Sequence, residues 1–217
     1  MALTTIEQVR LLTNISVDEI SDEDLNSLIN QATKEIMSKI NVNVNREHIQ
    51  YIDNTRENKI DGSNTTYYVK NWENKYISDR NADGLVDTND IIVYAVASDG
   101  TETKATISSV DYDDGSFTLD SPYDSSYNLY VTYAYSHFDP VTPDPLLELA
   151  ATYLVASYAY LKRDVGLDGS VKFGNVSINE KLSASYGEFY KRYLEILKQL
   201  NKKSALSSNW VESKVKI

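Results

Sequence analysis

The spacing of apolar residues changes twice along this chain of 217 residues. Apolar side chains recur every three or four positions up to about residue 52, and every second position from about 58 to 137. After Pro143 the longer spacing returns. A period near 3.6 marks one face of an α-helix, and a period of 2 marks one face of a β-strand. The chain is therefore predicted to be α+β, with helices at both ends and antiparallel strands between them.

Two helices are predicted in the N-terminal part. Thr4 and Glu7 fit a capping box for the first helix, and Ser21 and Asp24 give the start signal of the second. The second helix has a polar face and an apolar face, so it is expected to pack on one side only. Its apolar face consists of Leu25, Leu28, Ile29, Ala32, Ile36 and Ile40.

The first helix of the C-terminal part is predicted to be apolar on most of its faces. Asp144 can cap it, Pro145 suits its first position, and the apolar run covers 146–162. Such a helix is expected to be buried on several sides, in the centre of a bundle or in a subunit contact. A glycine-punctuated loop over 165–178 and a final amphipathic helix over about 179–202 follow.

The middle of the chain predicts a small antiparallel sandwich or barrel. Turn signals at Asp99-Gly100 and Asp114-Gly115 separate short runs rich in β-branched and aromatic residues. Asp114-Gly115 is the clearest hairpin signal, because both turn residues tolerate positive φ. The predicted strands are 67–72, 91–97, 105–112, 116–119 and 128–135.

This order of elements predicts a helical bundle with an insertion. The N-terminal helices of 1–52 are too few to enclose a core, so they are expected to pack on the helices of 138–203. The β region, 58–137, is then an inserted domain. The polar segment 204–217 is predicted to be an extended tail that orders only against a partner.

The composition excludes several classes of function. The chain has no cysteine, which excludes disulfides, zinc–thiolate sites and a cysteine nucleophile. A formal net charge of −11 argues against tight binding to phosphate backbones, although an acidic wall would let DNA slide past. We see neither a signal peptide nor an apolar run long enough to cross a bilayer.

The most specific chemical motif is the twelve-residue stretch DRNADGLVDTND at 79–90. Calcium loops supply oxygen ligands from positions 1, 3, 5, 7, 9 and 12 and place glycine at position 6, which here is Gly84. Position 12 is Asp rather than the Glu of EF-hands, and a strand pattern rather than a helix follows it. We therefore predict a calcium ion that staples a β-loop, and the alternative is an acidic, solvated loop without an ion. The predicted ligands are Asp79, Asn81, Asp83, the carbonyl of Leu85, Asp87 and Asp90.

No catalytic constellation stands out. Tyr158 and Lys162 match a Tyr-x-x-x-Lys pattern, but the chain lacks the glycine-rich turn that dinucleotide binding needs. Acidic residues near 111–120 are better explained by turns and surface positions in a chain with 32 Asp and Glu. We expect no enzymatic activity.

The two ends of the chain resemble head–tail connector (adaptor) proteins of tailed bacterial or archaeal viruses. The similar segments are LTTIEQVRLLTNI with ISDEDLNSLINQATKEIMSKINV, and LLELAATYLVASYAYLKR with VKFGNVSINEKLSASY and the last helix. They cover about 1–52 and 138–203, and the middle of the chain resembles a β-insert of larger members. The shared features are patterns of apolar spacing, not catalytic signatures.

The resemblance implies a structural virion protein. Such subunits form a homo-oligomeric ring, typically of twelve, below the portal protein, where the ring extends the DNA channel and receives tail or stopper proteins. The expected location is the neck of the virion, after assembly in the host cytoplasm, with transient passage of DNA and no membrane contact. The alternative from a different class is a calcium-dependent protein-binding module, dockerin-like or on a cell surface.

Overall fold

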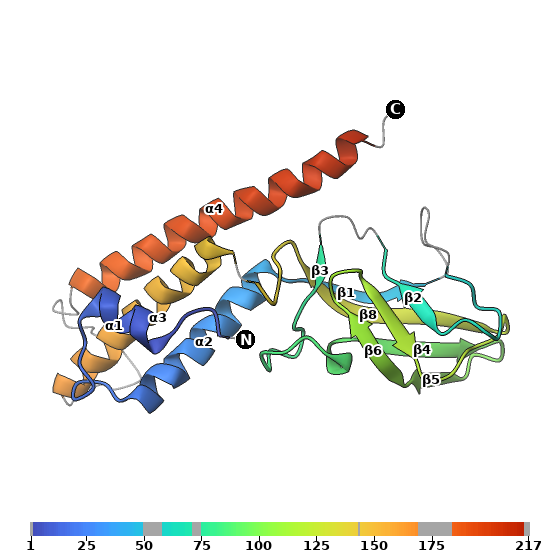
Figure 1. Cartoon of the computed structure of the whole chain (residues 1–217), viewed down its shortest axis with the longest axis horizontal. Coiled ribbons are helices and arrows are strands. Elements are labelled where there is room, and N and C mark those ends of the chain that lie inside the picture. The colour runs from blue at the N-terminus through green and yellow to red at the C-terminus, as the bar shows by residue number, and fades with distance from the viewer. Residues whose placement is uncertain (1, 50–57, 71–74, 143, 169–183, 215–217) are drawn as a thin grey trace. The chain divides into compact units, whose positions relative to one another are not determined.

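The chain is an α+β protein in the computed structural model, which describes residues 2–49, 58–70, 75–142, 144–168 and 184–214. It divides into two compact units (Figure 1). Ala2–Ser38 and Pro143–Ser208, from the two ends of the chain, form a helical unit. Lys39–Thr142 form most of the other unit, which contains the strands.

The helical unit contains α1 (Ile6–Thr13), most of α2 (Asp22–Ile40), α3 (Pro145–Asp168) and most of α4 (Ala184–Lys214). The predicted start of α2 is confirmed, because the Asp24 amide donates to Ser21 Oγ (3.1 Å). Its predicted apolar face is also mostly confirmed, because Leu25, Ile29, Ala32, Ile36 and Ile40 are buried.

The capping box of α1 lies one residue later than predicted. Thr5 is the N-cap: the Gln8 amide donates to Thr5 Oγ1, and the Thr5 amide donates to Gln8 Oε1, so Gln8 takes the place predicted for Glu7. Thr4 Oγ1 instead forms a buried hydrogen bond with Thr152 Oγ1 of α3 (2.7 Å). Thr4 and Thr5 are both good capping residues, and the contact with α3 decides between them.

Helix α3 is buried on nearly every side, as its composition predicts. Seven of its apolar residues are at most 2% exposed, while Leu149 stays 43% exposed. The helix continues to Asp168, past the predicted end at residue 162. The fully or almost fully buried residues are Leu147, Ala150, Ala151, Leu154, Val155, Ala156 and Ala159.

The C-terminal helix also differs in extent from the prediction. Helix α4 continues to Lys214, through most of the segment 204–217 that was predicted to be extended. Most of the predicted loop 165–178 and the first residues of the predicted last helix lie outside the described residues. Within the described residues, no helix is long and apolar enough to cross a membrane.

The β unit consists of two antiparallel sheets. The five-stranded sheet has the order β1 (Val42–His48), β8 (Tyr127–Ser136), β4 (Ile92–Ala97), β5 (Glu102–Ala105), and the short β3 (Tyr76–Ile77) pairs with the end of β8. The three-stranded sheet has the order β2 (Thr66–Tyr68), β7 (Ser116–Leu119), β6 (Ile107–Asp111).

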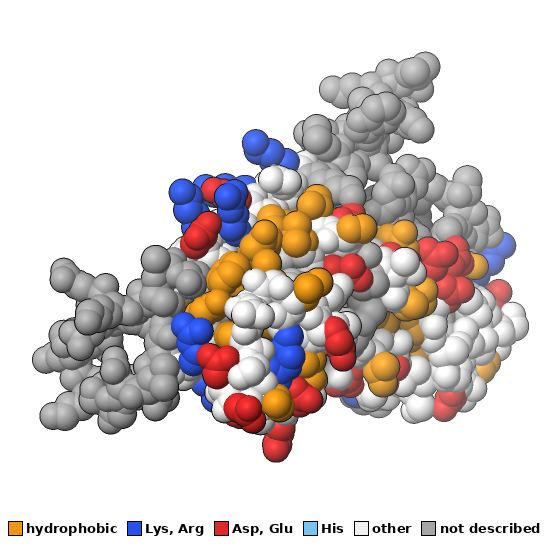
Figure 2. Space-filling view, turned by 60° about the vertical axis from the view of Figure 1, so that its left-hand side comes forward, with side chains coloured by type: hydrophobic (Ala, Val, Ile, Leu, Met, Phe, Trp, Pro, Cys, Tyr) orange, Lys and Arg blue, Asp and Glu red, His pale blue; other side chains and the backbone are white. Residues whose placement is uncertain are grey.

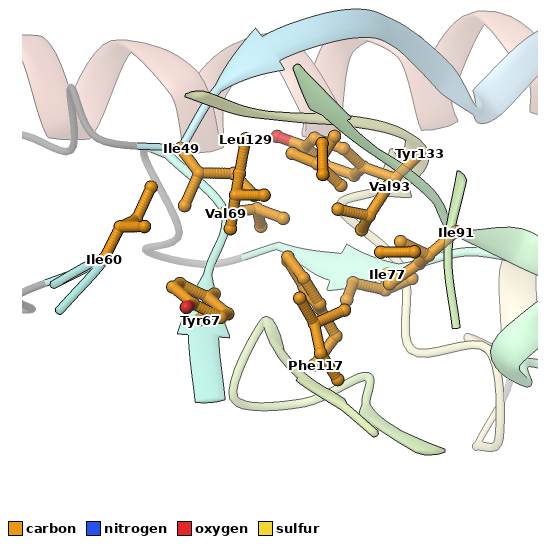
Figure 3. Packing of buried hydrophobic residues seen from close by; sticks show 14 residues of the cluster. Ile49, Ile60, Tyr67, Val69, Ile77, Ile91, Val93, Phe117, Leu129 and Tyr133 are labelled. Carbon is orange, nitrogen blue, oxygen red and sulfur yellow. The ribbon is translucent and has the colours of Figure 1, made fainter. Parts of the chain in front are cut away.

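Both sheets contribute to one hydrophobic core. Figure 3 shows side chains from both sheets and from the segments beside them lying close together, among them Tyr67, Phe117, Val93 and Tyr133. The rings of Tyr67 and Phe117 stack at 6.0 Å between centroids. Each of these four residues is at most 2% exposed, so the β unit has a core of its own.

The strand predictions hold best where a turn residue fixes the register. The hairpin around Asp114-Gly115 is confirmed, because β6 pairs with β7. Its turn covers the four residues 112–115 between the two strands, and Gly115 adopts positive φ (67°) whereas Asp114 does not. The predicted strand 105–112 is instead divided between β5 and β6 on either side of Thr106. Strand β1 was not predicted at all, and residues 71–72 of the first predicted strand lie outside the described residues.

Candidate calcium site

The segment 79–90 links β3 to β4 and ends in a short 3₁₀ helix, η1 (Thr88–Asp90). The predicted strand after it is confirmed as β4, which begins at Ile92. Asp79, the first residue of the segment, is fixed to the rest of the β unit by Asn41, whose Nδ2 donates to the carbonyl oxygen of Asp79 (3.1 Å). Ser78 Oγ in turn donates to Asn41 Oδ1 (2.7 Å).

Asp79, at position 1, organises the first half of the loop. Its Oδ1 accepts a hydrogen bond from the amide of Asp83 (3.2 Å), and its Oδ2 accepts one from the amide of Gly84 (2.7 Å). Gly84 has φ of 96° and Ala82 has φ of 58°, so two residues adopt left-handed backbone geometry to make this turn. Asp79 itself is only 9% exposed.

Asp90, at position 12, organises the second half. Its Oδ1 accepts from the amides of Arg80 (2.6 Å) and Asn81 (3.1 Å), and its Oδ2 accepts from the amide of Asp87 (2.9 Å). Burial raises the pKa of Asp90, the three amide hydrogen bonds lower it, and the nearby charge of Asp79 raises it further. The carboxyl group is fully buried, so one end of the loop is tied to the other inside the unit.

The remaining predicted ligands shape the loop by local hydrogen bonds. Asn81 Oδ1 accepts from the amide of Asp83 (2.9 Å), and Asp83 Oδ1 accepts from the amide of Leu85 (2.9 Å). Asp87 Oδ1 accepts from the amide of Asn89 (2.7 Å). These side chains fold over the backbone two residues further on, a common arrangement for Asx residues in turns.

The chemistry of this loop fits a hard cation. Its donors are carboxylate, amide and carbonyl oxygens, which calcium prefers. Asp79 and Asp90 bring two carboxylates together in a poorly solvated place, where a cation would relieve their repulsion. Among the described residues, no group of three or more acidic or histidine side chains stands close enough together to hold a metal ion. The calcium site therefore stays a prediction.

Arg80 is the basic residue of the loop segment 79–90. Its Nε donates to the carbonyl oxygen of Asp90 (3.0 Å), and its Nη2 donates to the carbonyl oxygen of Asn89 (3.5 Å). The side chain therefore binds backbone at the end of the loop. Leu85, at position 7, has a side chain that is 67% exposed.

The other residues weighed in the sequence have structural roles. Tyr158 Oη donates to Glu35 Oε2, and Lys162 forms an ion pair with Asp24 (2.6 Å), so the two residues of the Tyr-x-x-x-Lys pattern bind different partners on α2. Asp111 Oδ1 accepts from the amides of Asp113 and Asp114 and stabilises the hairpin turn.

One polar cluster was missed by sequence reasoning. Glu35 of α2 accepts hydrogen bonds from Tyr158 of α3 and from Tyr193 of α4, the latter at 3.3 Å. Burial raises the pKa of both tyrosines, and the glutamate raises it further. Its three members are widely separated in sequence, and Glu35 follows the helical pattern of a half-exposed polar position, so no local signal marks it.

No protein-family model matches the chain, and a search of curated proteins likewise finds no match.

Proposed function

We propose that this chain is a head–tail connector subunit of a tailed virus. In this proposal it is a structural virion protein of the neck, without enzymatic activity. It forms a homo-oligomeric ring, of about twelve copies as the resemblance implies, below the portal. The ring extends the DNA channel and receives tail or stopper proteins, and assembly takes place in the host cytoplasm.

One observation carries the proposal. The segments that resemble connectors, about 1–52 and 138–203, largely coincide with the two segments that build the helical unit, Ala2–Ser38 and Pro143–Ser208. The segment without that resemblance forms most of the other unit. A connector-like helical bundle that carries an inserted β domain accounts for this division of the chain.

The net charge and the aromatic side chains of the chain agree with a ring subunit whose inner wall lines a DNA channel. A subunit with a net charge of −11 repels a phosphate backbone in the absence of a dedicated basic groove. DNA can then move through a ring without being held. Tyr153 and Tyr160 of α3 and Phe189 of α4 are half-buried. Such aromatic side chains suit subunit contacts, because their rings tolerate both water and apolar neighbours.

The calcium loop has a supporting role in this proposal. A bound calcium ion would neutralise Asp79 and Asp90 and fix the link between β3 and β4 inside the inserted domain. A calcium-dependent binding module is the second candidate, and the exposed side chain of Leu85 would suit it. The strand β4 after the loop argues against a dockerin, in which each loop is followed by a helix.

The test is to identify what binds the protein during infection. A tagged copy, expressed in infected host cells and purified under mild conditions, is expected to bring down portal and tail or stopper proteins, identified by mass spectrometry. A copy with its helical core disrupted by Leu154→Asp serves as the control. Recovery of a host surface protein whose binding is lost in chelator, with no portal protein, would support the second candidate instead.

A further inference from the structure

The two sheets of the β unit end in four edge strands within the described residues: β1 and β5 in one sheet, β2 and β6 in the other. An edge strand presents backbone N–H and C=O groups with which a strand of another chain can pair, so folded proteins protect their edges. Strands β1 and β6 are protected by irregular pairing, because each shifts register against its neighbour. Strand β5 carries the exposed, charged side chains of Glu102 and Lys104.

Strand β2 has neither of these protections. Its pairing with β7 is regular and extends from Thr65 to Val69: the Leu119 amide donates to the Thr65 carbonyl oxygen (2.9 Å), and the Val69 amide donates to the Gly115 carbonyl oxygen (3.0 Å). The segment 65–69, TTYYV, consists of β-branched and aromatic residues. Figure 2 shows acidic and basic side chains scattered over the described surface, but this segment contributes none. Uncharged segments of this composition are prone to pair with other chains when their edge is open.

The outward backbone groups of β2 belong to Thr66 and Tyr68. In an antiparallel pair, successive residues direct their N–H and C=O groups to opposite edges of the strand. Thr65 and Val69 direct theirs to β7, so Thr66 and Tyr68 direct theirs away from it. The side chain of Tyr67, between them, is buried in the core (Figure 3). Without further contacts, four backbone groups would be open at this edge.

Two asparagine side chains bind all four of these groups. Asn58 Oδ1 accepts from the Tyr68 amide (2.9 Å), and Asn58 Nδ2 donates to the Tyr68 carbonyl oxygen (2.8 Å). Asn64 Oδ1 accepts from the Thr66 amide (3.1 Å), and Asn64 Nδ2 donates to the Thr66 carbonyl oxygen (2.9 Å). A side-chain amide offers a carbonyl acceptor and N–H donors, as a peptide group does. The two asparagines therefore take the place of a neighbouring strand.

Turn formation does not account for Asn58. Asn64 lies two residues before Thr66, and asparagine commonly binds backbone at that spacing in turns. Asn58, however, is 10 residues from Tyr68 along the chain. Its Nδ2 also donates to the carbonyl oxygen of Ile49 (2.8 Å), the residue that follows β1. The position of Asn58 is explained by the edge that it covers.

We infer that Asn58 and Asn64 close the outer edge of β2 against strands of other chains. The partner that they exclude is an extended, uncharged peptide segment, which includes β2 of a second copy. The protein then stays soluble at this edge because of two hydrogen-bonding side chains rather than a charge. The inference concerns the β unit alone and does not depend on the proposed connector function.

The test opens the edge and leaves the core unchanged. Asn58→Ala removes the amide that covers Tyr68, and aggregation is followed by thioflavin T fluorescence and light scattering well below the melting temperature. The variant is expected to form β-rich aggregates at protein concentrations at least about tenfold lower than the wild type needs. Adding Thr66→Lys places a charge on the open edge. This second variant is expected to aggregate like the wild type, although the lost hydrogen bonds are not restored.

The control is Asn41→Ala, which removes another asparagine of the β unit that binds a backbone carbonyl group, that of Asp79, away from β2. It is expected to lose stability in urea unfolding but to aggregate no more readily than the wild type. Far-UV circular dichroism checks that every variant is folded, and if Asn58→Ala is not, Asn64→Ala opens the Thr66 end of the same edge in its place. The inference is overturned by an opened edge that stays as soluble as the wild type. It is equally overturned by an Asn41 variant that aggregates as readily, or by aggregation that Thr66→Lys does not suppress.

Discussion

A single carboxylate connects three helices of the helical unit. Glu35 extends from α2 and accepts hydrogen bonds from the hydroxyl groups of Tyr158 on α3 and Tyr193 on α4. Hydrogen bonds to a charged acceptor are stronger than those between neutral groups. Removing the Glu35 carboxylate would also leave two partly buried hydroxyl groups without this acceptor. The cost of these unsatisfied hydroxyl groups is larger than the net contribution of the hydrogen bonds themselves.

Glu35→Ala is therefore expected to lower the free energy of unfolding of the helical unit by about 1–3 kcal/mol. Urea unfolding followed by circular dichroism at 222 nm measures this change. The matched control is Lys34→Ala, at the neighbouring, exposed position of α2, which is expected to change stability by less than about 0.5 kcal/mol. Equal stability of the Glu35 variant and the control would mean that Glu35 does not connect the helices.

The same cluster predicts a loss of stability at high pH. Burial, together with Glu35, raises the pKa of Tyr158 and Tyr193 above the ordinary value of 10.0. The folded chain therefore keeps these protons where the unfolded chain releases them. Their stabilising contribution is complete below about pH 10 and declines as the pH rises above it. The double variant Tyr158→Phe with Tyr193→Phe is expected to show a shallower decline in thermal melts over that range, and an identical decline would contradict the assignment.

The predictability of a residue depends on how local its partners are. The candidate calcium loop is visible in the sequence because all of its positions lie within twelve consecutive residues and their spacing is itself the signal, while calcium binding there stays a prediction. The partners of Glu35 are 123 and 158 residues away, so only the packing of the helices reveals them. The shift of the α1 cap from Thr4 to Thr5 has the same cause, because Thr152 binds Thr4 from 148 residues away.

At the scale of elements, the irregular strand β1 is held by one residue in an unusual conformation. Its pairing with β8 shifts register between Val44 and Glu47, and Arg46 in this bulge has φ of 54°. The Arg46 guanidinium binds both carboxylate oxygens of Glu102 and lies over the rings of Tyr94 and Tyr130, at 5.1 and 5.3 Å from their centroids. These contacts offset the strain of a left-handed backbone.

Two substitutions separate the strain from the contacts. Arg46→Gly removes the contacts and the strain together, whereas Arg46→Ala removes the contacts and keeps the strain. Both are expected to lower the melting temperature of the β unit, and Arg46→Ala is expected to lower it further. Differential scanning calorimetry measures the order of the two. A glycine variant less stable than the alanine variant would show that strain is not what the contacts offset.

Strands were predictable where side chains alternate and a turn fixes their ends, and less so elsewhere. Strand β7 has the predicted bounds, β4 begins one residue later than predicted, and β8 is one residue longer at each end. Strand β5 has three exposed polar residues, and its backbone pairing with β4, rather than an apolar face, defines it. Strand β1 is mostly polar and follows α2 after a single residue, so its period of two is hidden beside a strong helical pattern.

At the scale of the whole molecule, two units with separate cores are expected to respond differently to calcium. A calcium ion that neutralises Asp79 and Asp90 would stabilise the β unit and leave the helices unaffected. Adding millimolar calcium to chelator-treated protein is expected to raise the melting temperature of the β unit alone, as followed by differential scanning calorimetry.

The control for this experiment is Asp83→Ala, which removes one proposed ligand on an exposed side chain and is expected to abolish most of the calcium effect. The helical signal at 222 nm is expected to melt at the same temperature with and without calcium. Melts of the wild type that do not change with calcium would contradict the idea of a calcium staple and would leave the connector proposal untouched.

The central claim is that the chain assembles into a ring on a portal. The most direct measurement is electron microscopy of the purified protein in negative stain, alone and after mixing with the portal protein of the same virus. We predict monomers or mixed small oligomers for the protein alone, and closed rings seated on portal particles in the mixture. Portal particles that remain bare at saturating protein concentration would contradict the claim.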